Sequence, residues 1–392
     1  MNEVKEAATN SIGLALSGGG VRAAAFHAGV LQYLAEQRLL EKVVHVSSVS
    51  GGSLFVGMVF QKGNYQWPDS ETYLRQVLPH VRETLTTKSL QCSAILRLML
   101  NPLNWRFFLS RANVLAQAIS GLWGVKVSLD ALRGAPVWSI NGTTGETGRR
   151  YRFKNGTMGD YELGYTTVEG FSLAGAMAIS AAFPGGIGPL TIKVRKFQWK
   201  KRKHWNDHHP EPYQPPFSRL HLYDGGIYDN LGIEPMFNVG QQSLKEDETL
   251  PSNISYLLVS DGGAPLAREK IPRPLNPFRF KRIADIALDQ CRALRVRAFV
   301  HFLHKIPTAG AYIGIGTPAV SSIKNFATGR EFLVDKLLRE EWLSDKDAKR
   351  TANLSTTLGQ MKESTFDLLA RHGYETAKWN MEMMSQATSS TT

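Results

Sequence analysis

Residues 43–52 read VVHVSSVSGG, a β-branched apolar run that ends in a serine and two glycines. This pattern predicts a buried strand, a tight turn and then a helix that continues through Phe60. Residues 12–20, IGLALSGGG, repeat the pattern, and apolar residues at helical spacing follow up to Gln37. Two such units indicate a parallel α/β sheet. Because the carboxyl ends of parallel strands share one edge, we expect the two glycine turns to lie together there.

The rest of the chain predicts helices and short strands around this centre. Residues 70–129 have a mostly helical, amphipathic pattern, Leu220–Tyr223 and Ile254–Val259 are typical of short strands, and the segment after about Asn325 is polar and helical. We expect a three-layer α/β/α sandwich with a mainly parallel central sheet. Its predicted units are an N-terminal tail (1–11), an α/β domain (12–324) with a helical insertion at about 70–129, and a helical C-terminal extension with a disordered tail (325–392).

Composition places the chain among globular proteins. Its 392 residues are 43% hydrophobic and 20% charged, which allows a sizeable core. The two cysteines, Cys92 and Cys291, lack metal-ligand spacing and are too few for a disulfide framework, which indicates a reducing compartment. Residues 1–10 lack the apolar segment of a signal peptide, and the uncharged stretches 43–61 and 171–192 are interrupted by glycine, serine or proline. We therefore expect a cytoplasmic protein without a transmembrane helix.

Basic residues outnumber acidic ones and give a net charge of +12. The excess is concentrated at residues 149–154, 193–203 and 279–282. Such patches attract nucleic acid or acidic phospholipid headgroups, although a solvated face explains each patch equally well. The sequence has no helix-turn-helix, zinc or RNP-type signature, so we expect no nucleic-acid partner.

Ser50 is the candidate nucleophile. A serine at a sharp strand-to-helix turn projects its hydroxyl above the sheet, in a pattern usually written G-x-S-x-G. Ser48 stands at the first glycine position and Gly52 at the last. Ser50 is favoured over Ser48 and Ser53 because it alone combines the strand's end with a glycine two residues later. Taken alone, such a segment more often marks an ordinary structural turn.

The glycine run Gly18–Gly20, followed by Arg22, is the second candidate element. Consecutive glycines after a strand let N–H groups converge, and the N-terminus of the following helix adds its positive end. This arrangement suits a phosphate or the oxyanion of a tetrahedral intermediate. The G-x-G-x-x-G pattern of dinucleotide sites is not clearly present, which disfavours a nucleotide. Arg22 is predicted either to steady the loop or to help bind an anionic substrate.

Asp224 is the candidate base. It ends a predicted strand and precedes Gly225 and Gly226, so its carboxylate can approach another strand's turn and accept a proton from a serine. A turn aspartate that binds its own backbone is the structural alternative. The tripeptide at 261–263 is a competing copy of Asp-Gly-Gly, and spacing does not separate the two.

Four motifs, taken in order, resemble the patatin-like phospholipases. They are the G-G-G-x-R run at 18–22, the serine elbow at 48–52, SAAFPG at 180–185 and DGGIYDN at 224–230. The resemblance extends from about Ile12 to Ala264. Ser17 replaces an aspartate found in many members, and Ser48 replaces the elbow glycine.

The resemblance implies a Ser–Asp dyad with Ser50 as nucleophile and Asp224 as base, because the 224–230 run matches the family motif better than Asp261 does. It also implies an oxyanion hole and supporting glycines. The implied oxyanion-hole residues are Gly18, Gly19, Gly20, Arg22 and Gly51, and the supporting residues are Gly52, Gly225 and Gly226.

The implied activity is that of a lipid acyl hydrolase of phospholipase A or lysophospholipase type, acting on membrane phospholipids through an acyl-Ser50 intermediate. An acyltransferase and a non-catalytic lipid- or nucleotide-sensing protein are the alternatives. We expect no cofactor and no metal, since no loop has the alternating carboxylates that calcium needs.

The histidines are predicted to be structural or solvated. His204, Asp207, His208 and His209 lie in a proline-rich segment without helical H-x-x-x-H spacing, which favours a solvated loop over a metal site. His27 and His45 fall near the candidate site by chain position, and we expect each to be a satisfied histidine without a catalytic role.

Two segments are candidates for peripheral contact with an anionic membrane. Leu96–Phe108 combines apolar and aromatic residues with arginines, and Lys193–Trp205 places Trp199 and Trp205 among lysines. An internal amphipathic helix and a solvated basic loop explain them equally well. A regulator that acts on residues 70–129 or on the C-terminal third is a further hypothesis.

Overall fold

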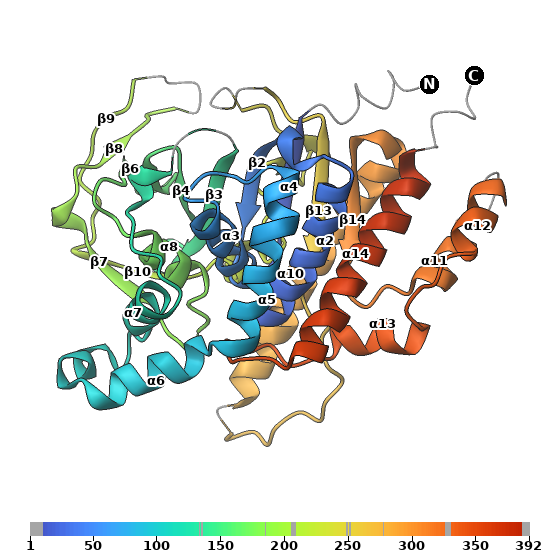
Figure 1. Ribbon diagram of the computed structural model, residues 1–392. Coiled ribbons are helices and arrows are strands. Elements are labelled where there is room, and N and C mark those ends of the chain that lie inside the picture. Colours follow the sequence, from blue (N-terminus) through green and yellow to red (C-terminus); the bar gives the residue numbers. More distant parts are fainter. Residues whose placement is uncertain are drawn as a thin grey trace.

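A mixed β-sheet forms the centre of the molecule (Figure 1). The computed structural model describes residues 11–385 except 133, 135, 185, 205–208, 248–249, 251, 277 and 326–330. Five neighbouring strands run parallel, and the sheet continues beyond the last of them with antiparallel strands. The parallel strands are, in spatial order, β14 (Gly310–Gly314), β13 (Tyr256–Asp261), β1 (Ile12–Leu16), β2 (Val43–Ser48) and β3 (Val137–Thr144).

The antiparallel part of the sheet begins at β3. One branch continues through β4 (Arg150–Lys154), β5 (Thr157–Asp160), β6 (Gly164–Thr167), β8 (Lys200–Lys201) and β9 (Glu211–Pro212). A second branch pairs β3 with β10 (Arg219–Asp224), which in turn pairs with β7 (Leu190–Lys193). A separate short ribbon joins β11 (Phe237–Asn238) to β12 (Ser243–Leu244).

Alternating side chains of the parallel strands belong to two separate hydrophobic cores, one on each face of the sheet. Leu14 and Leu258 belong to the large core, whereas Ala15 and Val259 belong to the smaller core on the opposite face. Such alternation follows from the period-two geometry of a strand, and apolar residues at both phases require cover on both faces. The predicted three-layer sandwich is therefore confirmed.

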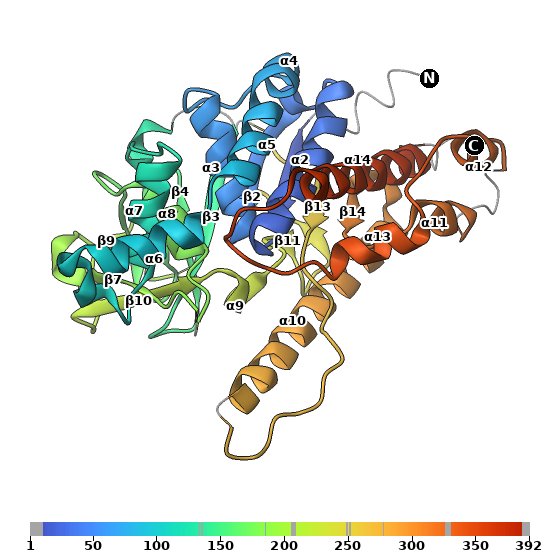
Figure 2. The ribbon, with the colours of Figure 1, turned by 60° about the horizontal axis from the view of Figure 1, so that its bottom comes forward.

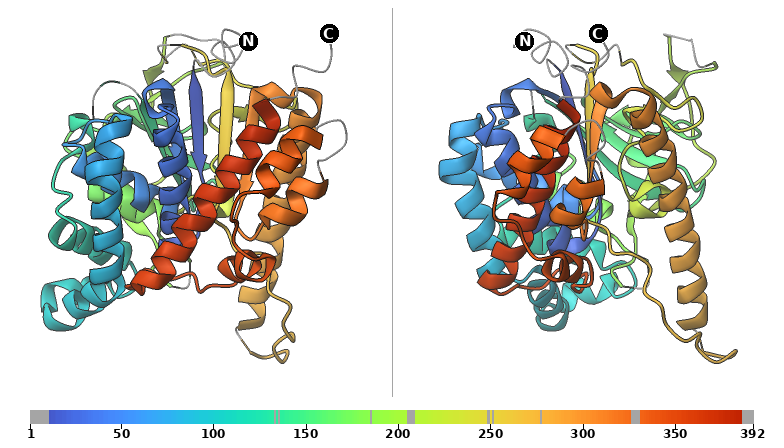
Figure 3. Two further views of the ribbon diagram at one scale, coloured as in Figure 1. Left: turned by 45° about the vertical axis from the view of Figure 1, so that its right-hand side comes forward. Right: turned by 90° about the vertical axis from the view of Figure 1, so that its right-hand side faces the viewer.

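Helices supply that cover (Figure 3). The large core receives α2 (Gly20–Glu36), α3 (Gly51–Lys62), α5 (Leu78–Thr87) and α14 (Glu363–Ser385), and the C-terminal half of α10 (Phe278–Lys305) packs on the smaller core. Helices α11 (Ala319–Asn325), α12 (Glu331–Leu338) and α13 (Asp345–Ala352) lie beside α14. No helix in the described part of the chain combines the length and apolarity that crossing a bilayer requires.

Helix α14 packs tightly against α2, although its sequence suggested a separate extension. A Cβ atom on Gly29 would lie 2.9 Å from the Cα of Ala370, and one on Gly373 would lie 3.0 Å from the backbone carbonyl carbon of Phe26. These glycines let the two backbones approach, so residues of α14 join the core built by residues 12–324.

The segment between α3 and β3 is helical, as the periodicity predicts. It contains α4 (Ser70–Thr72), a π-helical turn η2 (Tyr73–Val77), α5, α6 (Leu90–Leu100), η3 (Pro102–Phe107), α7 (Ala112–Leu122) and η4 (Leu129–Ala131). Helix α5 contributes to the core, whereas α6 and η3 extend away from it (Figure 2).

Candidate active site

Ser50 occupies the sharp turn between β2 and α3. Its backbone has φ 50° and ψ −118°, a conformation that non-glycine residues rarely adopt. The turn is held by the Ser50 N–H, which donates to the carbonyl of Ser180 at 3.1 Å and to its hydroxyl at 3.0 Å. Strain stabilised in this way is typical of a nucleophile elbow.

The two glycine turns meet, as predicted. A Cβ atom on Gly51 would lie 2.6 Å from the Gly20 nitrogen, and one on Gly52 would lie 2.8 Å from the Ser17 oxygen. A Cβ atom on Gly18 would lie 3.1 Å from the Cβ of Ser50. The close approach of the two backbones explains why glycines are needed on both sides.

Asp224 lies at the end of an antiparallel strand, β10, which brings it close to Ser50. It ends β10, opposite Gly142 of β3, while Ile140 of β3 lies opposite Ser48 of β2. The Asp224 carboxylate accepts a hydrogen bond from the N–H of Gly226 at 2.7 Å, and the Ser50 hydroxyl lies close enough to affect its pKa. Burial raises the pKa of Asp224 to about 7, although the Gly226 N–H and the Ser50 hydroxyl both act to lower it. The structure thus places the Ser50 hydroxyl next to a carboxyl whose pKa is about 7.

The competing Asp-Gly-Gly copy has different partners. Asp261 is fully buried and accepts hydrogen bonds from Arg292 at 2.6 and 3.0 Å, from the Tyr312 hydroxyl at 2.6 Å and from the Gly263 N–H at 2.9 Å. A carboxylate satisfied by this many donors is typical of a structural ion pair. This geometry distinguishes Asp261 from Asp224, which spacing could not do.

Ser180, the last residue of α8 (Leu173–Ser180), links the two halves of the site. Its carbonyl accepts from the Ser50 N–H and, at 3.3 Å, from the Gly225 N–H. Its hydroxyl contacts Ser53 at 2.8 Å and donates to the Asn141 carbonyl at 2.7 Å. The sequence pointed to this motif through the family resemblance, but the bridging role of Ser180 carried no separate signal.

The alternative serines are engaged elsewhere. The Ser48 hydroxyl accepts from the Trp138 indole N–H at 2.8 Å and contacts Ser53 at 2.8 Å. Both serines are fully buried in this chain of hydrogen bonds, whereas Ser50 is half-buried. These contacts agree with the preference for Ser50.

The glycine loop presents unpaired N–H groups next to Ser50. The Gly18 N–H donates to the Asn230 carbonyl at 3.0 Å. Within the described ranges, the N–H groups of Gly19, Gly20 and Gly51 donate to no backbone or side-chain acceptor. Gly19 and Gly20 have φ values of 142° and 62°, which glycine adopts without strain.

Arg22 is anchored to backbone carbonyls. Its guanidinium donates to Gly262 at 2.9 Å and 3.3 Å and to Leu354 at 2.6 Å. Burial lowers its pKa to about 10, although Asp261 acts in the opposite direction. Of the two roles predicted for Arg22, these contacts favour steadying the loop.

A C-terminal segment covers the glycine loop, and no sequence pattern indicated it. The Val21 N–H donates to the Thr357 carbonyl at 3.0 Å, and a Cβ atom on Gly20 would lie 3.2 Å from the Thr357 nitrogen. The same segment accepts from Arg22 at Leu354 and from the Gln91 N–H at Leu358, at 3.1 Å. Residues 354–358 therefore connect the glycine loop to the start of α6.

Both histidines near the site are buried, but of the two only His27 has both ring nitrogens hydrogen-bonded, as we expected of each. His27 contacts the Ser260 hydroxyl at 2.7 Å and the Ser17 carbonyl at 3.0 Å, and burial lowers its pKa to about 4. His45 contacts the Ser139 hydroxyl at 2.8 Å through Nε2, but its buried Nδ1 has no hydrogen-bond partner in the described part of the chain, so the prediction of a satisfied histidine is wrong for His45. Burial lowers the pKa of His45 to about 3. Asp207 and His208 lie outside the described residues, and the remainder of the described chain contains no group of three metal-ligating side chains.

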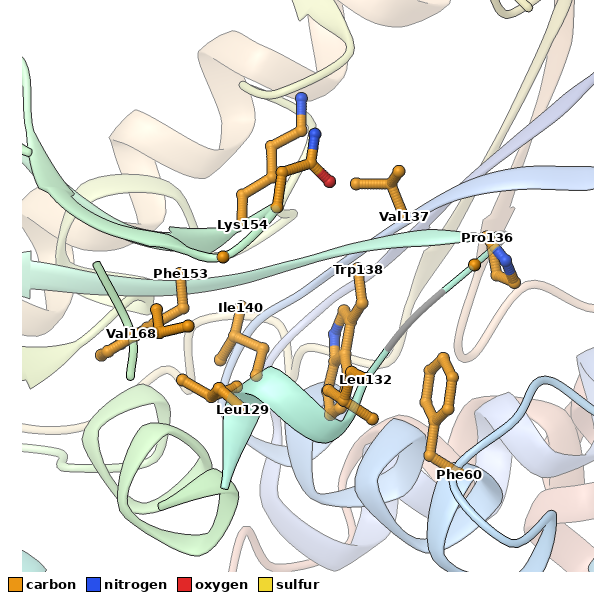
Figure 4. Close-up of a pocket in the computed structure, with 13 residues that line it drawn as sticks. Phe60, Leu129, Leu132, Pro136, Val137, Trp138, Ile140, Phe153, Lys154 and Val168 are labelled. Atoms are coloured by element: carbon orange, nitrogen blue, oxygen red, sulfur yellow. The ribbon is translucent and has the colours of Figure 1, made fainter. Parts of the chain in front are cut away.

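Two cavities lie outside the serine turn. One of about 60 Å³ lies at the start of β3, where Phe60, Leu132 and Trp138 approach one another and Lys154 points away (Figure 4). The other, an open groove of about 710 Å³, lies beyond the carboxyl ends of β13 and β14 and is lined by Arg268, Arg292 and Lys349. Neither contains a predicted site residue.

Comparison with known proteins identifies the fold and the family. A solved structure of human GIVD cytosolic phospholipase A2 matches with a TM-score of 0.50 and 14% identity, covering 97% of this chain and 62% of that one. Its complex with a methyl γ-linolenyl fluorophosphonate inhibitor and terbium chloride gives a TM-score of 0.48 at 14% identity, covering 97% and 59%. VipD from Legionella pneumophila gives 0.29 at 11% identity, covering 97% and 92%.

The chain thus spans less than two thirds of the first of these structures. No curated protein matches the sequence. The family model for patatin-like phospholipases matches residues 14–237, which include the serine turn, the glycine loop and Asp224. The chain therefore belongs to the patatin-like phospholipase family.

Proposed function

We propose that this chain is a phospholipid acyl hydrolase of phospholipase A or lysophospholipase type, with Ser50 as nucleophile and Asp224 as base. The contact of the Ser50 hydroxyl with the buried Asp224 carboxyl, inside the family domain, carries this proposal. A carboxyl whose pKa is about 7 accepts a proton at neutral pH far better than an ordinary aspartate, because a base is most effective when its pKa is near the working pH.

The reaction proceeds by two acyl transfers. Asp224 takes the hydroxyl proton while the Ser50 oxygen attacks the ester carbonyl, and collapse of the tetrahedral intermediate expels the alcohol, which takes the proton back. Asp224 then deprotonates water, which attacks the acyl-serine. Collapse of this second intermediate releases the fatty acid, and Asp224 returns the proton to the Ser50 oxygen. The N–H groups of Gly19, Gly20 and Gly51 stabilise the oxyanion in both steps, supported by the adjacent N-termini of α2 and α3.

The substrate proposed is an ester-linked acyl chain of a membrane phospholipid, reached through peripheral contact with an anionic bilayer. Family membership supports a lipid ester, and the net charge of +12 supports an anionic surface. Transfer of the acyl group to an alcohol instead of water uses the same residues and remains the second candidate.

A fluorophosphonate probe tests the nucleophile directly. We expect one probe per chain, attached to the tryptic peptide that contains Ser50, and fatty-acid release from mixed phospholipid vesicles that stops in proportion to labelling. Added glycerol distinguishes the two candidates, because an acyltransferase passes the acyl group from acyl-Ser50 to glycerol and forms glyceride in place of free fatty acid. Labelling at another serine, with vesicle hydrolysis intact, contradicts the proposal.

The raised pKa of Asp224 predicts a pH dependence. The base must be ionised, so kcat/KM on a soluble ester should fall about tenfold per pH unit below 7 and level off above it. The folded chain also binds this proton more tightly than the unfolded chain, whose pKa is near 3.8, so stability from the protonated form is lost as pH rises through about 7. Asp224→Asn should therefore raise the melting temperature at pH 8 but not at pH 4. A flat rate profile between pH 5 and 8 contradicts the assignment.

A further inference from the structure

A helical segment and a loop followed by a helix extend past the edge of the sheet at which Ser50 lies (Figures 2 and 3). The first arm consists of α6, η3 and residues 108–111. The second arm consists of residues 268–276 with the first turns of α10, residues 278–286. The parallel strands point toward this side of the molecule, so the arms lie on either side of the edge at which Ser50 sits.

Large apolar side chains of the first arm are exposed to solvent. Leu103 is 72% exposed and Leu109 is 82% exposed. Leu90 is the only buried residue of helix α6. This segment is therefore not the internal amphipathic helix that its sequence also allowed. The exposed apolar residues of the first arm are Ile95, Leu96, Met99, Leu100, Leu103, Trp105, Phe108 and Leu109.

The second arm has the same character. Leu275 is 99% exposed and Phe280 is 77% exposed, although residues further along the same helix, such as Phe299, are buried in the smaller core. Isolated exposed apolar residues are ordinary, whereas a concentrated set indicates an interaction surface. The exposed apolar residues of the second arm are Ile271, Leu275, Phe278, Phe280, Ile283 and Ile286.

Positive charge accompanies these side chains. Residues 90–111 contain three arginines and no acidic residue. Residues 268–286 contain six lysines and arginines against two acidic residues. A second copy of this chain is a poor partner for this surface, because a symmetric contact would bring the two sets of like charges together.

Hydrogen bonds link both arms to segments that contact the glycine loop of the candidate site. At the base of the first arm, the Gln91 N–H donates to Leu358, in the segment that also covers the glycine loop. Further along α10 than the second arm, Arg292 donates to Asp261 at the end of β13. The next residue, Gly262, accepts a hydrogen bond from Arg22 through its carbonyl. A surface that engages both arms therefore contacts segments that are joined by hydrogen bonds to the neighbours of the glycine loop.

We propose that the two arms together dock the enzyme on an anionic phospholipid bilayer, by inserting their apolar side chains at the headgroup boundary while their arginines and lysines bind lipid phosphates. Apolar insertion combined with basic residues is the chemistry by which peripheral helices bind such membranes. For the second arm, the sequence indicated the basic patch at residues 279–282 but not the exposed apolar side chains beside it. The predicted Lys193–Trp205 element is wrong at Trp199, which is buried and donates to Val194 at 3.1 Å, and Trp205 lies outside the described residues.

This inference rests on the proposed lipid substrate, but binding can be measured without catalysis. Ser50→Ala protein is sedimented with neutral phosphatidylcholine vesicles and with vesicles containing 30–40% phosphatidylglycerol, about the range that gives a strong surface potential. We expect preferential binding to the anionic vesicles. The pairs Leu100→Glu/Leu103→Glu and Phe278→Glu/Phe280→Glu should each weaken this binding about tenfold or more, since each removes two inserted side chains.

The matched control is Phe332→Glu. Phe332 of α12 is 86% exposed but belongs to neither arm, so this variant should bind vesicles like the parent. In a background with Ser50 intact, the arm variants should lose vesicle hydrolysis yet keep activity on a soluble short-chain ester, which also shows that they fold. Equal binding by the arm variants and parent overturns the proposal, as does a dimer on size exclusion that the arm substitutions convert to monomer. Failure of hydrolysis with vesicle binding preserved instead refutes only the proposed function.

Discussion

Ser50→Ala and Asp224→Asn should each lower kcat/KM for ester hydrolysis by at least about a thousandfold, and the double variant should be little worse than either one. Ser50→Ala removes the atom that forms the acyl bond. Asp224→Asn keeps the shape of the side chain but removes its capacity to take the hydroxyl proton. Because the two groups act in one step, their effects do not add. Initial rates on a soluble ester, with melting temperatures measured in parallel, check this result.

Two controls make the comparison specific. Ser53→Ala removes a hydroxyl from the neighbouring network with Ser48 and Ser180 and should leave most of the activity. Asp261→Asn disrupts the ion pair with Arg292, so it should lower the melting temperature, while the fraction that remains folded stays active. Full activity in Ser50→Ala or in Asp224→Asn refutes the dyad, and loss of activity only in Asp261→Asn would move the base to the other Asp-Gly-Gly copy.

Local sequence patterns predicted the parallel strands and the two glycine turns at the centre of the molecule. Strand and turn chemistry around Ser50 and Gly18–Gly20 depends on neighbours within a few residues, and the parallel sheet then requires the two turns to share an edge. The choice between Asp224 and Asp261 needed tertiary contacts, because both aspartates end a strand and precede two glycines. Only their partners differ, a serine hydroxyl for one and an arginine with a tyrosine for the other.

Features that depend on distant parts of the chain could not be predicted in the same way. Thr357 covers the glycine loop from a segment more than 300 residues later, through a backbone carbonyl that every residue type possesses. The sequence predicted Trp199 as a candidate membrane contact because lysines surround it, yet its indole is buried. In a short segment of this kind, composition does not indicate which face turns inward, because neither helical nor strand periodicity is long enough to define one.

Gly51→Ala should lower kcat by about a hundredfold to a thousandfold while the protein remains folded, the cost usually found when one oxyanion donor is lost. The new methyl group would lie 2.6 Å from the Gly20 nitrogen, and a backbone group cannot rotate away as the end of a flexible side chain can. The glycine loop must therefore shift, and the unpaired N–H groups of Gly19 and Gly20 lose their alignment with the carbonyl that Ser50 attacks. KM should change much less than kcat, since these donors bind the oxyanion more strongly than the ground-state ester.

Gly57→Ala is the matched substitution for Gly51→Ala. It lies on the same helix, α3, and its methyl group would meet the sulfur of Met177 at 2.5 Å, near the flexible end of a side chain. We therefore expect Gly57→Ala to retain near-parental kcat, with at most a modest change in melting temperature. If Gly51→Ala retained full kcat, or if Gly57→Ala lost as much, the N–H groups of the glycine loop could not be the groups that stabilise the intermediate. The oxyanion would then have to be held elsewhere, although Ser50 and Asp224 could still exchange the proton.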